Sequence, residues 1–309
     1  MSFLRATLQP AAARVLPEND ASSLRVAISA HLFRWLPRVL LLGGSAAIGY
    51  LCIAANPVAV VGACAQAGPG IILVFLAPSV GLLLHTLAWR CLLPVDARPG
   101  LWASYRILLA AQAGNELGLG VLGEPIKVAA LPRAHRRAAL RAVLTDNLAA
   151  LSALLIFLGF FGGIIGVTQL AAHALPLALG GAAVVVALAI ILVHLRSRPL
   201  FAAYSTALHT AGKAWIVAEF ALATALFGCH AFALDVLLGV SSSLASLIGA
   251  PVPGQVGVVE SAVAGVAKGA GVSASTAVAI VLVRRARSCF WILIGGVFLQ
   301  RINKANHRA

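Results

Sequence analysis

The chain has 309 residues, of which 61% are hydrophobic and only 10% are charged, and its mean hydropathy is +0.98. Soluble domains carry about 25% charged and about 45–50% apolar residues, so this composition excludes a water-soluble protein and also a disordered one. The net charge of +14 would indicate nucleic-acid binding in a soluble chain. In a membrane chain it indicates basic cytoplasmic loops instead, and no nucleic-acid partner is expected.

The N-terminal part, residues 1–30, is polar and carries arginines without an apolar run at its start. This pattern is typical of a cytoplasmic extension before a retained first span, and not of a cleaved signal peptide. Stretches apolar enough to cross a membrane follow at about 36–56, 70–94, 142–167, 174–195, 214–234 and 275–300. Two further stretches, at about 104–131 and 236–270, are apolar but interrupted by glycine, proline and carboxylates.

The distribution of lysine and arginine assigns each loop to one side of the membrane. Segment 107–123 has basic residues on both flanks, so both of its ends are expected in the cytoplasm. Segment 57–69 has no basic residue and is expected to be an outer loop, and segment 236–270 enters and leaves from the outer face.

We therefore predict an all-α, polytopic helical bundle in a membrane, with both termini in the cytoplasm. It has six full spans and two opposed re-entrant hairpins within residues 31–302, and a cytoplasmic tail at 303–309. The alternative is that both hairpins cross the membrane fully, since hydropathy alone does not distinguish the two arrangements.

A short internal repeat supports the two hairpins. Both interruptions read Gly-x-x-Gly followed by a glutamate, from Gly120 to Glu124 and from Gly254 to Glu260. Inverted repeats whose broken helices meet near the midplane are common in transporters. Unwound backbone at membrane depth lines protein or a cavity, so these residues are candidates for holding a polar substrate. Alternatively, each glutamate caps the N-terminus of a half-helix.

Three arginines lie near the middle of the last apolar stretch: Arg284, Arg285 and Arg287. Each ionisable group at the centre of a span costs about 2.5–3.5 kcal/mol, so the cluster must face carboxylates, water or a ligand. Arg284 and Arg287 share one helix face with Ser288 and Trp291. Because guanidinium groups bind phosphate through paired hydrogen bonds, the cluster predicts a headgroup or phosphate site in a water-filled cavity. Alternatively, the arginines neutralise Glu219 or Glu260 and lock the bundle.

Other patterns carry less information. Lys127 begins a basic cluster that includes Arg133 and Arg141, which indicates a cytoplasmic anchor for anionic headgroups more strongly than a specific lipid site. Residues 118–123 match the dinucleotide fingerprint, but that motif has meaning only between a strand and a helix. Five scattered cysteines and eight dispersed histidines predict no disulfide framework and no metal site, and no cofactor is expected.

Two segments and the last span are similar to a known family. Asn115 to Lys127 reads Asn-Glu-Leu-Gly-Leu-Gly-Val-Leu-Gly-Glu-Pro-Ile-Lys, and Val252 to Glu260 reads Val-Pro-Gly-Gln-Val-Gly-Val-Val-Glu. These segments, with Arg284-Arg285-Ala286-Arg287, resemble the flippase-like transmembrane region of lysylphosphatidylglycerol synthases and related stand-alone bacterial proteins. The Arg-Ala-Arg arrangement is particularly similar to the subgroup found with hopanoid-biosynthesis genes. Asp146 stands where the family often has an acidic residue.

The resemblance implies a non-enzymatic protein that moves or presents an amphipathic lipid across the inner membrane. The lipid is of the hopanoid, aminoacyl-phospholipid or polyprenyl-phosphate type, and its headgroup would pass near Glu124, Glu260 and the arginines. The expected substrate-binding residues are Asn115, Glu124, Lys127, Asp146, Gly254, Glu260, Arg284, Arg285 and Arg287. Two alternatives remain: an embedded enzyme that modifies a lipid headgroup, and a non-transporting partner of lipid-synthesis enzymes. Membrane lipids, lipid-biosynthesis enzymes and further copies of the chain are the candidate partners.

Overall fold

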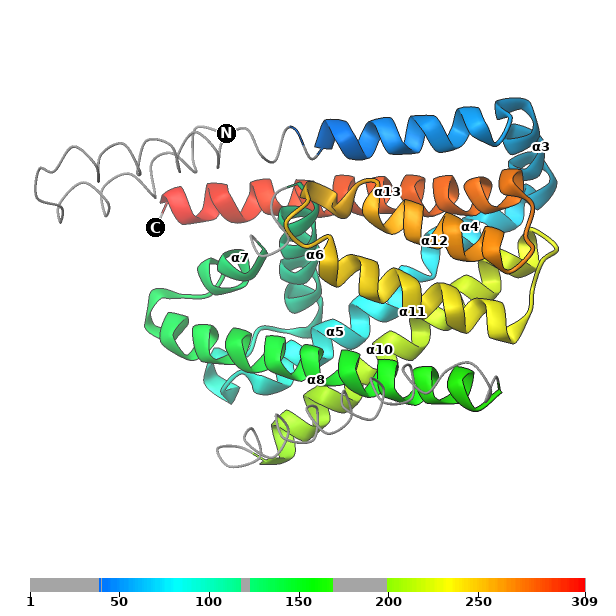
Figure 1. The fold of residues 1–309 in the computed structure, drawn as a ribbon. Helices are drawn as coiled ribbons and strands as arrows, with labels where there is room; N and C mark the ends of the chain where they lie inside the picture. Colours follow the sequence, from blue (N-terminus) through cyan, green and yellow to red (C-terminus); the bar gives the residue numbers. More distant parts are fainter. Residues whose placement is uncertain (1–38, 40, 118–122, 169–198, 309) are drawn as a thin grey trace, which may run out of the picture.

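The structure is a computed structural model, and it describes residues 39, 41–117, 123–168 and 199–308 (Figure 1). Within these ranges every regular element is a helix and no strand occurs, which confirms the predicted all-α class. The predicted extension at 1–30 and the apolar stretch at 174–195 lie outside the described residues, as does the centre of the first interruption, 118–122.

The described part of the chain forms the following helices, given in chain order. A first helix covers Leu41–Ala54, and the helices after it are α3 Pro57–Ala67, α4 Ile71–Leu76, α5 Pro78–Leu92, α6 Leu101–Leu117, α7 Gly123–Ala129, α8 Arg136–Thr168, α10 Pro199–Leu226, α11 Phe232–Ile248, α12 Val258–Gly269 and α13 Ala274–Arg308. Short 3-10 turns lie at Gly68–Gly70, Val95–Ala97, Arg133–His135 and Pro253–Gln255.

Helix α13 runs along the whole bundle (Figure 1) and packs against α6, α3, α12 and α4, while the long helix α10 packs against α5, α8 and α11. The end of α13, helix α7 and the start of α8 lie together on the left in this view. We call this the basic end, because these segments and the 3-10 turn before α8 contain Arg133, Arg136, Arg137 and Arg301. The turns between α10 and α11 and between α12 and α13 lie at the opposite end.

The outside of the bundle is apolar. Large side chains that are more than 70% exposed there include Ile53, Val58, Leu200, Ile248 and Leu293. Soluble monomers rarely expose a continuous apolar surface of this kind. Two helical segments, Pro57–Leu92 and Arg133–Phe161, are long and apolar enough to cross a membrane, and α13 is also long enough at about 1.5 Å per residue.

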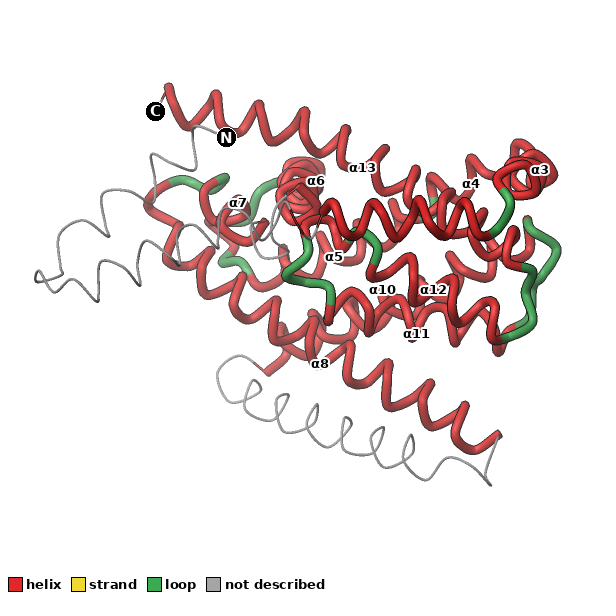
Figure 2. The backbone as a smooth tube through the Cα atoms, turned by 45° about the horizontal axis from the view of Figure 1, so that its top comes forward, coloured by secondary structure: helices red, strands yellow, loops and turns green. Residues whose placement is uncertain are grey.

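Both interrupted stretches form helical hairpins. Helix α6 and the short α7 pack together and turn back towards the basic end, while α11 and α12 enter from the opposite end (Figure 1). Figure 2 shows α6 nearly end-on, so it lies across the bundle and not along it. The turn at Pro253–Gln255, which joins α11 to α12, contacts α6, and the two hairpins therefore meet inside the bundle.

The segment from residue 57 to residue 94 corrects the sequence prediction. Residues 57–67 were predicted as a loop but form helix α3, which Asn56 caps by accepting a hydrogen bond from the Val58 N–H at 3.2 Å. The predicted second span lies largely within the span-length segment Pro57–Leu92, but it consists of two helices, since Pro78 begins α5. Two indole N–H groups bind carbonyls at this break: Trp291 donates to Phe75 and Trp215 to Ala77, both at 2.8 Å. Neighbouring side chains of this kind make a proline break tolerable at membrane depth.

Candidate functional site

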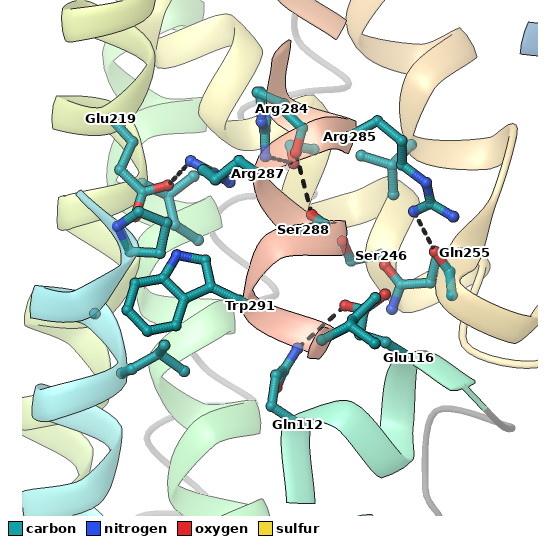
Figure 3. A pocket seen from close by; sticks show the side chains of 18 of the residues that line it. Gln112, Glu116, Glu219, Ser246, Gln255, Arg284, Arg285, Arg287, Ser288 and Trp291 are labelled. Carbon is teal, nitrogen blue, oxygen red and sulfur yellow. Dashed lines mark hydrogen bonds and ion pairs between the residues drawn. The ribbon is translucent and has the colours of Figure 1, made fainter. Parts of the chain in front are cut away.

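A cavity of about 280 Å³ lies where the two hairpins meet α5, α10 and α13 (Figure 3). Its lining contains many polar side chains, although the helices around it are largely apolar. The charged side chains that line it are Glu116, Lys213, Glu219, Glu260, Arg284, Arg285 and Arg287, and the neutral polar ones include His85, Gln112, Ser242 and Ser246. Four basic side chains face three acidic ones, so the lining carries an excess of one positive charge while the histidine is neutral.

The three arginines of α13 reach different parts of this cavity. Arg284 donates from Nη2 to the Ser242 hydroxyl at 3.2 Å, and its guanidinium carbon lies 3.9 Å from the centre of the Phe220 ring. Its other terminal nitrogen, Nη1, is buried without a hydrogen-bond partner among the described residues. A buried donor without a partner costs about 1–3 kcal/mol, and more when it is charged. Arg284 is therefore arranged to receive a further acceptor.

Arg285 holds the tip of the second hairpin. It donates to the Gly254 carbonyl at 2.9 Å and lies 3.4 Å from the Glu260 carboxylate. Glu260 in turn accepts the Gly257 N–H at 2.8 Å, so it caps the first turn of α12. Gly254 has φ of +58°, and a Cβ there would lie 3.0 Å from the Glu116 carbonyl oxygen. The tip can therefore touch α6 only because this residue is glycine.

Arg287 and Glu219 form a buried ion pair across the cavity. Their N–O distance is 2.7 Å, and about 10% of each side chain is exposed. On the other side, Gln112 donates to Glu116 at 3.1 Å, and both residues lie on α6 (Figure 3). Two of the three carboxylates thus contact an arginine, and the third is bound by an amide.

A second cluster of charges lies beside the first hairpin. Lys127 on α7 is buried with its ammonium 3.1 Å from Glu124 and 3.3 Å from Asp146 on α8. The other oxygen of Asp146 lies 2.8 Å from Nε2 of His209 on α10. The His209 ring packs against His85, with ring centroids 4.8 Å apart. Because His85 also lines the cavity, the two polar regions are in contact.

Asn115 closes the first hairpin. Its side-chain oxygen accepts the Gly123 N–H at 2.6 Å, which joins the end of α6 to the start of α7 across residues 118–122. The signature asparagine therefore has a structural contact that explains its place before the turn. It does not line the cavity.

The structure thus divides the predicted site residues into two groups. Gly254, Glu260 and the three arginines line the cavity, together with Ser288 and Trp291, as the helical spacing predicts. Glu124, which was expected in the same site as Glu260, pairs with Lys127 and does not line the cavity. Lys127 was expected in the basic anchor, but α7 turns its ammonium into the bundle.

Four polar cavity or cluster residues escaped the sequence prediction: His85, Gln112, His209 and Lys213. A signal for them existed, since each lies within a largely apolar helix, where ionisable and amide groups are uncommon. No group of three or more residues suited to a metal ion occurs in the parts of the chain that the structure describes. The cavity instead offers guanidinium donors for an anionic or strongly polar group.

Comparisons with known proteins agree with this architecture. The sequence profile of the family described as the lysylphosphatidylglycerol synthase TM region matches residues 24–210, which is more than half of the chain. The match includes the first hairpin, Lys127, Asp146 and His209, and it ends before the second hairpin and α13. No curated protein and no solved structure matches the chain.

Proposed function

Because this chain belongs to the family of the lysylphosphatidylglycerol synthase TM region, we propose that it moves or presents an amphipathic lipid across a bacterial inner membrane. Membership makes it a membrane protein of the lipid modification or transport type. That this chain transports a lipid goes beyond family membership, and this part of the proposal depends on the cavity. The observation that carries it is three arginines from one helix around a polar cavity inside an apolar bundle.

The size of the cavity supports binding of a headgroup and not of a whole lipid. Its volume, about 280 Å³, is near the lower end of the roughly 300–1,000 Å³ that small-molecule pockets have. Acyl or polyprenyl tails are apolar and gain nothing from a site lined by seven charged side chains. In the proposed mechanism the headgroup passes through the cavity while the tail stays in the surrounding lipid.

The charge of the cavity favours a headgroup with an anionic part. The unpaired Nη1 of Arg284 supplies a donor for it, and the excess positive charge supplies the attraction. Among the three candidate classes this favours the aminoacyl-phospholipid and polyprenyl-phosphate types over a hopanoid with an uncharged headgroup. The similarity of the Arg-Ala-Arg arrangement to the hopanoid-associated subgroup keeps a phosphate-bearing hopanoid within the proposal.

The orientation is also proposed. Cytoplasmic loops carry an excess of lysine and arginine, so the basic end with Arg133, Arg136, Arg137 and Arg301 would face the cytoplasm. The first hairpin then enters from the cytoplasmic side and the second from the outer side. The headgroup site would lie where they meet, which suits a protein that exposes one site to the two sides in turn.

Transport is proposed over headgroup chemistry because of how the carboxylates are used. Glu219 accepts from Arg287, and Glu260 accepts the Gly257 N–H while it contacts Arg285. These contacts fix the carboxylates as acceptors that orient the arginines and the hairpin. A general base needs its lone pairs directed at the substrate proton.

The test is lipid exchange between the leaflets of liposomes that contain the purified protein. The probe is a fluorescently labelled anionic phospholipid, and a labelled neutral lipid serves for comparison. Arg284→Gln should slow exchange of the anionic probe about tenfold or more, because a hydrogen bond to a charged group contributes about 1.5–3 kcal/mol. This substitution leaves no buried carboxylate without its partner, since Arg284 contacts Ser242 and Phe220.

Arg301→Gln is the matched control. Arg301 lies on the same helix and also packs on an aromatic ring, that of Phe298 at 5.9 Å, but it does not line the cavity. Its substitution should leave exchange unchanged. No acceleration by the wild-type protein would refute transport. Chemical change of the probe's headgroup would favour the embedded enzyme, and equal effects of the two substitutions would remove the role of the cavity.

A further inference from the structure

A continuous file of titratable side chains connects the first hairpin to the cavity. It begins at Glu124, whose side chain is 21% exposed, and passes to Lys127 at 3.1 Å. Lys127 contacts Asp146 at 3.3 Å, and Asp146 contacts His209 at 2.8 Å. The ring of His209 meets the ring of His85 edge to face, at an interplanar angle of 80°. Each member therefore contacts the next, and the last one lines the cavity.

We propose that this file carries protons between the basic end of the bundle and the cavity, so that lipid movement is coupled to a proton gradient. The proposal rests on the proposed function, because it assigns a coupled ion to the same cavity. An imidazole can receive a proton at one ring nitrogen and release one from the other. His209 has this arrangement: Nε2 faces Asp146, while Nδ1 is buried with no partner among the described residues.

The charges of the file favour a proton over a metal cation. Lys127 already fills the space between the Glu124 and Asp146 carboxylates, at 3.1 and 3.3 Å. Two carboxylates and one ammonium leave one negative charge, which a single proton on His209 neutralises. The part of the chain that the structure describes has no group of three or more metal-binding residues here. The same net negative charge would repel an anion.

The charged groups that face the two histidines come from several helices. Lys127 of α7, Asp146 of α8 and Lys213 of α10 act on His85, in addition to His209 itself. The edge-to-face contact includes no hydrogen bond between the two rings, so in the proposed transfer the His209 ring turns, or a water molecule enters, to join Nδ1 to neutral His85. The proton that passes leaves His209 neutral and ready to take the next proton. His85 then releases its proton into the cavity. Gly212 gives the His85 ring its room, since a Cβ there would lie 3.0 Å from Nε2.

The experiment measures lipid exchange in liposomes with and without a pH gradient, while valinomycin and equal potassium hold the membrane potential at zero. The probe is the labelled anionic phospholipid, read by extraction with albumin. For the wild-type protein we expect the gradient to accelerate exchange at least threefold. In His209→Gln the ratio of the exchange rates with and without the gradient should fall to about one, because the amide can still donate to Asp146 but does not titrate. His85→Gln, at a half-buried position, should give the same result.

His230→Gln is the matched control, because His230 also forms a 2.8 Å pair with an aspartate, Asp235, but lies outside the file. It should keep the wild-type ratio. Exchange that is independent of the gradient in the wild-type protein, or a ratio that both glutamine variants keep, would overturn the proton file and leave the proposed function intact. A wild-type protein that exchanges no lipid at any pH would instead refute the proposed function, and the proton coupling with it.

Discussion

The ion pair between Arg287 and Glu219 gives the sharpest test of how this bundle holds its charges. Removing one partner by Arg287→Gln or Glu219→Gln leaves the other charge inside the bundle. The pair has an N–O distance of 2.7 Å and side chains about 10% exposed. At an effective dielectric constant of about 20, two unit charges at that separation attract by about 6 kcal/mol.

Desolvation of both ions offsets most of this attraction, so the pair contributes little net stability compared with a neutral pair. Loss of one partner is different, because the remaining charge keeps its desolvation cost without the attraction. Each single substitution should therefore lower the free energy of unfolding by about 3–5 kcal/mol. The double substitution Glu219→Gln/Arg287→Gln should recover to within about 1 kcal/mol of the wild-type protein.

The assay is unfolding by sodium dodecyl sulfate in mixed micelles, followed by tryptophan fluorescence. An exposed pair serves as the reference: His135 and Asp96 lie 3.7 Å apart, and 73% of the Asp96 side chain is exposed. Asp96→Asn should change the free energy of unfolding by less than about 1 kcal/mol. If the single substitutions at 219 and 287 are as mild as Asp96→Asn, the pair is hydrated and the cavity is not a low-dielectric site. If the double variant is no more stable than the singles, the two residues do not act on each other.

Two further predictions use the same unfolding assay. Gly254→Ala should lower the free energy of unfolding by about 1–3 kcal/mol, because its positive φ strains an alanine and the new Cβ meets Glu116. Gly265→Ala, in open space on α12, should instead raise it by up to about 1 kcal/mol. Equal losses of stability in the two variants would contradict this reasoning. Trp215→Phe should cost about 0.5–1.5 kcal/mol more than Trp89→Phe, because it removes the hydrogen bond to the Ala77 carbonyl, which keeps the bond from the Val80 N–H at 3.3 Å. The Trp89 indole has no partner among the described residues, and equal costs would show that the Ala77 bond contributes nothing.

The hairpins and the arginine cluster were accessible to sequence reasoning because both leave a one-dimensional signal. Basic residues on the two flanks of segment 107–123 indicate a chain that returns to its side of entry, and the structure has α6 and α7 as a hairpin there. Three arginines within one apolar helix cost too much to face lipid. Their i, i+3 spacing then predicts one shared face, and Arg284 and Arg287 both line the cavity.

The partners of these charges were not accessible in the same way. Glu219 and Glu260 were both candidates for pairing with the arginines, and charge alone does not assign Arg287 to the first and Arg285 to the second. That choice depends on how α10 and the second hairpin are placed around α13. The order of the helices along the chain does not determine this placement, because the contacts join segments that are far apart in sequence.

Lys127 shows why local charge patterns mislead at a turn. In the sequence it stands a few residues before Arg133 and resembles the first member of a basic loop. The chain between them forms only the short helix α7 and a 3-10 turn, and α7 directs Lys127 inwards to Asp146. His85 and His209 were missed for a related reason, since their contact exists only because α5 packs against α10.

The balance of charges in the cavity sets a limit on how tightly it can hold a headgroup. Four basic side chains without carboxylates would bind a phosphate so strongly that release would be slow, and transport requires binding that is favourable on entry yet weak enough for exit. Glu116, Glu219 and Glu260 reduce the excess to one positive charge. Among the described side chains of the cavity, Arg284 has a buried terminal nitrogen without a partner, so an anion gains a strong new contact there, while at Arg285 and Arg287 it must compete with the existing pairs. Removing a carboxylate, as in Glu219→Gln, should therefore tighten binding of an anionic headgroup while it slows its exchange.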